Sequence, residues 1–267
     1  MILREIVVKS VLTKSNLPES DYCINPYVGC MHGCIYCYAR FMRRFTNHRE
    51  RWGEFVDVKV NAEEVLRKEL TRVRHQGVAL IGSVTDAYQP VERKYKITRA
   101  LLTALVEARF PVSILTKSDL VLRDLDLLKQ LNDCTVGLTI TTLDEEARRR
   151  FEPRSSSIAK RLNALRILHE NGIATYVFIG PILPYLTDLR AIFGAVLGIV
   201  DNVWAEALNI RCGNWADIEH VLEQHYPDLL RQYKVTVQDN RYWDEIGREL
   251  SRLSEEFQIP LVGYYRH

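Results

Sequence analysis

Short β-branched runs alternate with longer amphipathic segments through most of this chain, and this alternation restricts the fold more than any other feature. The strand-like runs cover residues 22–28, 78–81, 112–115, 135–140, 175–179, 203–210 and 261–264. Helical patterns cover residues 62–76, 98–108, 120–131, 189–200 and 242–257, and another helix ends at Gly172. Strands alternating with helices predict a parallel sheet with helices outside it, and six or more such units indicate a barrel, full or partial.

In barrels of this kind, the chemistry lies at the carboxyl ends of the strands. Those ends carry Cys30, Asp86, Lys117, Thr141, Gly180 with Pro181, and Asn209 with Arg211. Polar and conformationally special residues therefore gather where the barrel predicts a site.

Composition narrows the class of protein. The 267 residues are 47% hydrophobic and 26% charged, which is ordinary for a globular protein, and a net charge of +2 gives no strong field toward nucleic acid or membrane. No apolar run is long enough to cross a bilayer, and charge at Arg4 and Glu5 argues against a signal peptide. We therefore expect a cytoplasmic protein in which the six cysteines are reduced and clustered ones bind metal.

Three cysteines with the spacing C-x3-C-x2-C carry most of the chemical information: Cys30, Cys34 and Cys37. Three thiolates on one loop can hold three irons of a cubane cluster, and Gly29 and Gly33 allow the backbone to curl around it. The fourth iron then stays open for a chelating ligand, as a catalytic metal requires. By spacing alone, a zinc site with Cys23 as a fourth ligand and a set of unrelated cysteines remain open alternatives.

The residues around these cysteines resemble the signature of the radical S-adenosylmethionine (SAM) superfamily, including an aromatic residue, Tyr36, before the last cysteine. The longer string at residues 25–40, N-P-Y-x-G-C-x-H-G-C-x-Y-C-Y-A-R, is similar to the spore photoproduct lyase-like branch, often labelled DNA repair photolyase-like. Matching segments are T-D-x-Y-Q-P-x-E at 85–92, T-K-S at 116–118, F-E-P-R at 151–154 and I-G-P-I-L-P at 179–184.

The resemblance implies a partial (βα)6 TIM-like barrel over residues 22–212, with an N-terminal extension at 1–21 and a C-terminal helical extension at 213–267 packed on the barrel. It implies a [4Fe–4S] cluster whose open iron binds SAM. One electron from a reductant of the ferredoxin or flavodoxin type would release a 5′-deoxyadenosyl radical, which abstracts hydrogen from a substrate.

By the same similarity, each matched position has an expected role. The residues expected near the cofactor are Tyr36 and Gly180 to Ile182 at the adenine, Ser83, Thr85 and Asp86 at the methionine end, Lys117 at its carboxylate and Thr139 at the ribose. Arg154 is a candidate for carboxylate or substrate pairing, although capping of a helix C-terminus and pairing with Glu152 are open alternatives. Tyr36 and Tyr38 match two tyrosines of the lyase and are the predicted catalytic residues.

One departure from the lyase pattern concerns the substrate. The lyase has a hydrogen-donating cysteine just before the Thr/Ser-Asp pair, whereas residues 82–85 here read Gly-Ser-Val-Thr. Thymine-dimer repair is therefore disfavoured. The leading expectation for the unidentified substrate is a macromolecule, nucleic acid or protein, and the arginine- and aromatic-rich segment 40–52 is either a nucleic-acid surface or an ordinary packed helix. The competing functions are an iron–sulfur electron carrier or sensor without SAM turnover and a zinc-stabilised binding module.

Overall fold

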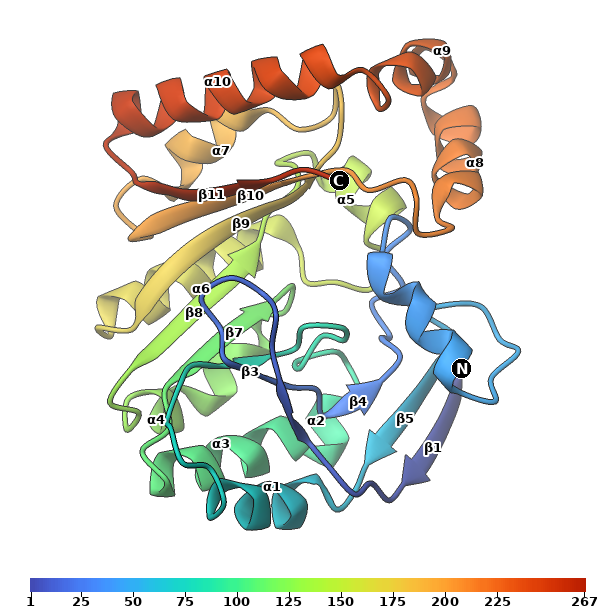
Figure 1. The fold of residues 1–267 in the computed structure, drawn as a ribbon. Helices are drawn as coiled ribbons and strands as arrows, with labels where there is room; N and C mark the ends of the chain where they lie inside the picture. The colour runs from blue at the N-terminus through green and yellow to red at the C-terminus, as the bar shows by residue number, and fades with distance from the viewer.

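A computed structural model describes residues 1–267 and contains an eight-stranded sheet in the order β11-β10-β9-β8-β7-β6-β3-β2 (Figure 1). Its six central strands are β3 (Tyr22–Ile24), β6 (Ala79–Ile81), β7 (Val112–Thr116), β8 (Cys134–Thr139), β9 (Ala174–Ile182) and β10 (Asn202–Ala207). Every neighbouring pair among them is parallel. The sheet ends at β2 and β11 and does not close, which confirms the predicted partial barrel.

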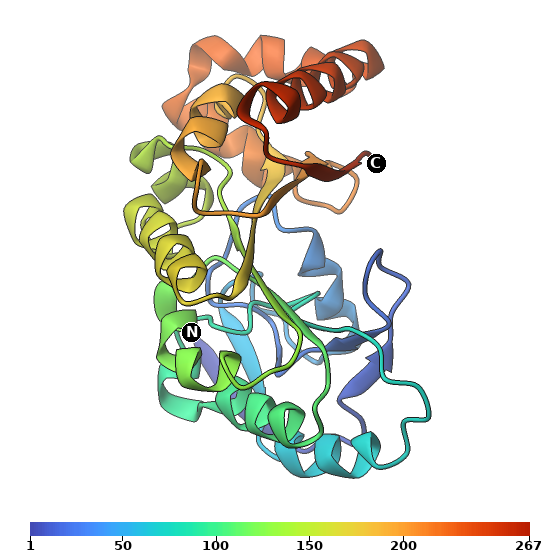
Figure 2. The same ribbon diagram turned by 90° about the vertical axis from the view of Figure 1, so that its left-hand side faces the viewer.

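Helices connect the parallel strands and cover the outer face of the sheet (Figures 1 and 2). They are α1 (Ala62–Leu70), α2 (Glu92–Tyr95), α3 (Ile97–Glu107), the 3-10 helix η2 (Asp119–Asp124) with α4 (Leu125–Leu128), α5 (Glu145–Phe151), α6 (Ile158–Glu170) and α7 (Leu189–Val196). Gly172 follows α6 at φ +78° and ends it as predicted, because glycine adopts this conformation without strain. The segment predicted as one helix over 120–131 instead divides into η2 and α4.

The predicted strand over 22–28 was wrong in one respect, because it divides between two sheets. β3 belongs to the large sheet, while β4 (Tyr27–Val28) joins β1 (Ile2–Ile6) and β5 (Phe55–Lys59) in a small sheet of order β1-β5-β4. Pro26 lies at the division and has no N–H to continue the first ladder. The sequence did not predict β1, β5 or β2 (Leu12–Lys14), which pairs antiparallel with β3.

The last part of the chain lies over one end of the sheet (Figure 1). It contains α8 (Trp215–His225), α9 (Pro227–Thr236), α10 (Asn240–Phe257) and β11 (Leu261–Tyr265), which pairs in parallel with β10. One apolar core of 53 buried residues extends from Val11 to Ile259, so both ends of the chain share it with the barrel. The domain boundaries at 22 and 213 stay predictions. None of the helices combines the length and the apolar character that a membrane span requires.

Candidate cluster and cofactor site

The cysteine loop, residues 29–37, follows β4 and carries the three predicted ligands. Cys30 and Cys34 are buried, Cys37 is half-buried, and all three are free thiols. Gly29 has φ +86°, and a Cβ atom there would lie 2.5 Å from the Phe55 carbonyl oxygen. Only glycine therefore lets the loop pack this closely on β5.

Side chains that follow β6 hold the start of the cysteine loop. Thr85 Oγ1 donates a hydrogen bond to the Gly29 carbonyl at 2.6 Å, and Gln89 Nε2 donates to the same oxygen at 3.2 Å. Gln89 Oε1 accepts from the Met31 backbone N–H at 2.7 Å. Thr85 was predicted at the methionine end of SAM, and the structure uses its hydroxyl to support the loop.

Arg154 lies against the outside of the same loop. Its Nη1 donates to the carbonyl oxygens of Met31 at 2.9 Å and Gly53 at 2.5 Å. It forms no ion pair with Glu152, so the pairing of these two residues that the sequence left open does not occur. The F-E-P-R motif thus places one charged side chain outside the loop and, at Glu152, one inside the core.

Two anchors at the end of the loop were not predicted. Arg40 donates to the carbonyl oxygens of Cys37 at 3.1 Å and Ile35 at 2.6 Å, and it pairs with Asp217 at 2.7 Å. Asn214 Nδ2 donates to the Tyr36 carbonyl at 2.8 Å. Arg40 belongs to the segment 40–52 for which a nucleic-acid surface was considered. Its guanidinium instead makes contacts within the protein, so it is not available to a nucleic acid. Arg40 ends the matched string at residues 25–40, whereas no local pattern in the sequence links Asn214 to the loop.

The donor set fits a multi-iron cluster. Burial raises the pKa of Cys30 to about 12, so these thiols would be neutral without a bound cation, whereas iron would hold them as thiolates. No three His, Cys, Asp or Glu side chains are placed to hold a single metal ion. A cubane cluster does not require three ligands around one ion, because each of its protein thiolates bonds a different iron.

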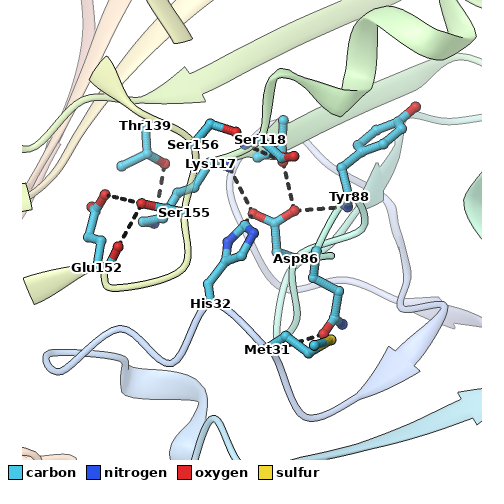
Figure 3. A network of polar contacts seen from close by, with 12 residues as sticks. Met31, His32, Asp86, Tyr88, Lys117, Ser118, Thr139, Glu152, Ser155 and Ser156 are labelled. Atoms are coloured by element: carbon cyan, nitrogen blue, oxygen red, sulfur yellow. Dashed lines mark hydrogen bonds and ion pairs between the residues drawn. The ribbon is translucent and has the colours of Figure 1, made fainter. Parts of the chain in front are cut away.

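Asp86 joins the segments that follow β6 and β7 to the cysteine loop (Figure 3). Its carboxylate accepts from Thr116 Oγ1 at 2.7 Å, the Lys117 N–H at 2.8 Å and the Tyr88 N–H at 2.9 Å, and lies 3.3 Å from His32 Nδ1. Burial opposes its charge, but His32 and these donors hold the pKa of Asp86 well below its ordinary value. This carboxylate therefore holds three segments of the chain together beside the site.

Lys117 lies beside Tyr36 and Thr139, two other residues that were expected to contact the cofactor. Its Nζ is 3.4 Å from Thr139 Oγ1 and 5.8 Å from the centre of the Tyr36 ring. Burial disfavours its charge, but the neighbouring Cys34 and Glu152 raise the pKa of Lys117 above its ordinary value. A protonated amine next to the cysteine loop is available to an anionic group.

A buried ion pair holds the hydroxyl group of Tyr36 in place. Glu152 and Arg161 are 0% and 1% exposed and form an ion pair, and Glu152 also accepts from the Tyr36 hydroxyl and from Thr141 Oγ1 at 3.1 Å. Burial opposes ionisation, but the charges of Arg161 and Lys117 lower the pKa of Glu152 to about 2. Arg161 was not among the residues predicted for the site.

The remaining predicted residues lie on three other segments. Tyr38 is 41% exposed, and its hydroxyl donates to the Ser83 carbonyl oxygen, while Ser83 Oγ accepts from Asn25 Nδ2 at 2.9 Å. Gly180 and Ile182 lie at the buried carboxyl end of β9. A Cβ atom at Gly180 would overlap the Phe178 ring at 1.8 Å, so this glycine makes room for that ring.

Comparisons with known proteins agree with this arrangement. The family model described as the radical SAM superfamily matches residues 24–190. An uncharacterised protein of Methanocaldococcus jannaschii is 38% identical over 91% of this chain and 90% of its own length. A radical SAM Nα-GlyT isomerase of Pseudomonas phage M6 is 25% identical over 66% of this chain and 37% of its own length.

Among solved structures, a spore photoproduct lyase mutant with bound S-adenosylmethionine and dinucleoside spore photoproduct has the same fold. Its TM-score is 0.69 and its sequence identity 18%, over 99% of this chain and 81% of the lyase chain. The fold, the cysteine loop and the family model all point to one assignment. This chain belongs to the radical SAM superfamily.

Proposed function

We propose that this radical SAM enzyme carries a [4Fe–4S] cluster on Cys30, Cys34 and Cys37, cleaves SAM reductively and acts on a macromolecular substrate, nucleic acid or protein. The observation that carries the proposal is the group of three free thiols on one loop, anchored from the segments after β6 and β8. When bound, cluster and SAM would supply a 5′-deoxyadenosyl radical once an external ferredoxin- or flavodoxin-type reductant has donated one electron.

In this proposal, the residues of the chain bind and orient the cofactor. Lys117 provides a fixed positive charge for the SAM carboxylate, and Thr139, 3.4 Å from its amine, keeps that charge in place. The Tyr36 ring, held through its hydroxyl by Glu152, gives the adenine an aromatic neighbour. Tyr38, which is 41% exposed, and Ser83, whose carbonyl accepts from the Tyr38 hydroxyl, would bound a more exposed part of the site.

A large substrate is supported by exposed side chains next to the cysteine loop. Phe45, at the end of the 3-10 helix η1 (Tyr38–Phe45), is 73% exposed, and Arg43 and Arg44 beside it are also exposed. Aromatic rings next to cations suit bases and phosphates as well as peptide side chains. Repair of the spore photoproduct is not proposed, because residues 82–85 contain no thiol, and a Cβ atom at Gly82 would lie 3.0 Å from the Thr85 carbonyl.

The central test is anaerobic reconstitution with iron and sulfide, followed by reduction in the presence of SAM. We expect iron–sulfur absorbance and 5′-deoxyadenosine, both lost when any cluster cysteine becomes serine. Cys134→Ser is the matched control, because this buried cysteine lies at the start of β8, away from the loop. An electron carrier or sensor would keep the absorbance and form no 5′-deoxyadenosine, which would refute SAM cleavage.

A second experiment identifies the substrate class. Nucleic acid and protein fractions from cells grown in heavy water are supplied separately to the reduced enzyme, and deuterium is measured in 5′-deoxyadenosine. Transfer from one fraction would identify its class. Transfer from neither, with 5′-deoxyadenosine still formed, would refute the macromolecular substrate while leaving SAM cleavage intact.

A further inference from the structure

A polar cavity of about 240 Å³ lies against the outside of the cysteine loop. Ten residues line it and none is hydrophobic. They come from the loop itself, at His32, and from the segments that follow β6, β7 and β8. An apolar ligand would find no matching surface there, so the cavity suits a charged or strongly polar group.

Three of the lining side chains are cations without an ionic partner. Arg93 lies in α2, Arg154 follows α5 and Lys160 lies in the first turn of α6. None of the three forms an ion pair, whereas Arg99 and Arg123 nearby both pair with carboxylates. The positive charge around this cavity is therefore available to a ligand.

The one carboxylate in the lining is partly engaged. Asp119 Oδ1 accepts a hydrogen bond from Ser156 Oγ at 2.5 Å, and the Asp119 N–H donates to the same hydroxyl oxygen at 3.0 Å. The three unpaired cations outnumber this single negative charge. The lining thus has an excess of positive charge, which favours an anion.

Helix α6 adds to this preference. The 13-residue helix directs its N-terminus, with Ser157 as N-cap, at the cavity, and a helix N-terminus favours anions. His32 lines the cavity while being 1% exposed, and its Nδ1 lies 3.3 Å from the Asp86 carboxylate. Figure 3 places His32 opposite Ser118, Ser155 and Ser156.

We propose that this cavity is a phosphate-binding site. Two guanidinium groups and an ammonium from three segments can donate to a tetrahedral group from several directions, and phosphate offers more acceptor oxygens than a carboxylate. The ligand is free phosphate or a phosphate monoester at the end of a nucleic acid. The proposal does not depend on SAM cleavage, because it rests on the charge and shape of a separate cavity.

Phosphate binding is linked to the cysteine loop through Arg154. This side chain lines the cavity and also donates to the Met31 carbonyl in the loop at 2.9 Å. His32 belongs to the loop itself. A ligand that holds Arg154 in place therefore also stabilises the loop conformation that the cluster needs.

The test is equilibrium dialysis of the reconstituted full chain with radiolabelled inorganic phosphate at constant ionic strength, because exposed cations are screened by salt. We expect saturable binding of one phosphate per chain. The double variant Arg93→Gln, Lys160→Gln should bind about tenfold more weakly, in line with the loss of charged hydrogen bonds. Both side chains are exposed, so the variant should fold normally.

The matched control is Lys94→Gln. Lys94 follows Arg93 in α2, does not line the cavity and has its amine over the Tyr95 ring. It should leave phosphate binding unchanged. Binding that is not saturable, or that is the same in the double variant and the wild type, would overturn the proposal.

Competition distinguishes the two sources of phosphate. A 5′-phosphorylated dinucleotide that displaces the label, when the unphosphorylated dinucleotide does not, supports a nucleic-acid end as ligand. Displacement by inorganic phosphate alone supports free phosphate. Equal displacement by both dinucleotides would mean that bases or phosphodiesters are recognised, and it would refute a site for a terminal or free phosphate.

Discussion

The buried ion pair between Glu152 and Arg161 makes a quantitative prediction about stability. Glu152→Gln removes the negative charge and leaves Arg161, which is 1% exposed, without its counter-charge. Breaking a buried pair in this way typically costs about 3–5 kcal/mol. For a chain of this size, that loss corresponds to a fall in melting temperature of roughly 10 °C.

The pH dependence of unfolding gives an independent measure of the same interaction. The pKa of Glu152 falls from 4.5 to about 2 on folding, which corresponds to on the order of 3 kcal/mol of stability. Because the folded pKa is the lower one, this contribution is fully present above pH 4.5 and is lost as the pH falls toward 2. Wild-type protein should therefore approach the stability of Glu152→Gln in acid.

The assay is urea unfolding of the cysteine-reduced chain without cluster, from pH 7 to pH 3, for wild type and variant. The control is Glu146→Gln, which breaks an exposed pair with Arg150 on α5 and should cost less than about 1 kcal/mol. Adding Arg161→Met to Glu152→Gln should restore part of the loss, because no buried charge then remains. Equal losses for the two single variants, or a difference between wild type and Glu152→Gln that does not change with pH, would refute this reasoning.

Three further predictions concern the site. Lys117→Met should weaken SAM binding by about tenfold, because it removes the amine proposed for the SAM carboxylate; unchanged affinity in equilibrium dialysis would reassign this lysine. Arg154→Lys cannot span two carbonyl oxygens as a guanidinium does, so amide exchange at residues 30–34 should accelerate, as measured by hydrogen–deuterium exchange mass spectrometry. Gly180→Ala forces the Phe178 ring to move and should cost about 1–3 kcal/mol in thermal unfolding; a neutral result would mean that β9 adapts freely.

The cysteine loop and the alternation of strands and helices could be predicted from the sequence because both signals are local. Three cysteines within eight residues indicate a shared metal group before any tertiary contact is known. The six central strands were predicted because a buried parallel strand is a short apolar run between helices. The family model over residues 24–190 confirms the radical SAM superfamily that the residues around the cysteines indicated.

The small sheet of β1, β5 and β4 could not be predicted in this way. β1 is short and largely exposed, and its partner β5 lies about 50 residues away in the chain. A strand of this kind is stabilised by its pairing and has no strong pattern of its own. Pro26 gave a hint that the run 22–28 is interrupted, but it did not indicate that the two halves join different sheets.

The sequence by itself determined that three cysteines lie close together on one loop of a parallel α/β scaffold. Only the tertiary structure decided which charged side chains serve that loop. Arg154 and Glu152 are separated by one residue, yet one donates to loop carbonyls and the other pairs with Arg161 in the core. Ligand spacing and periodicity are local properties of a chain, whereas the partner of a charged side chain depends on which segments meet in space and exclude water.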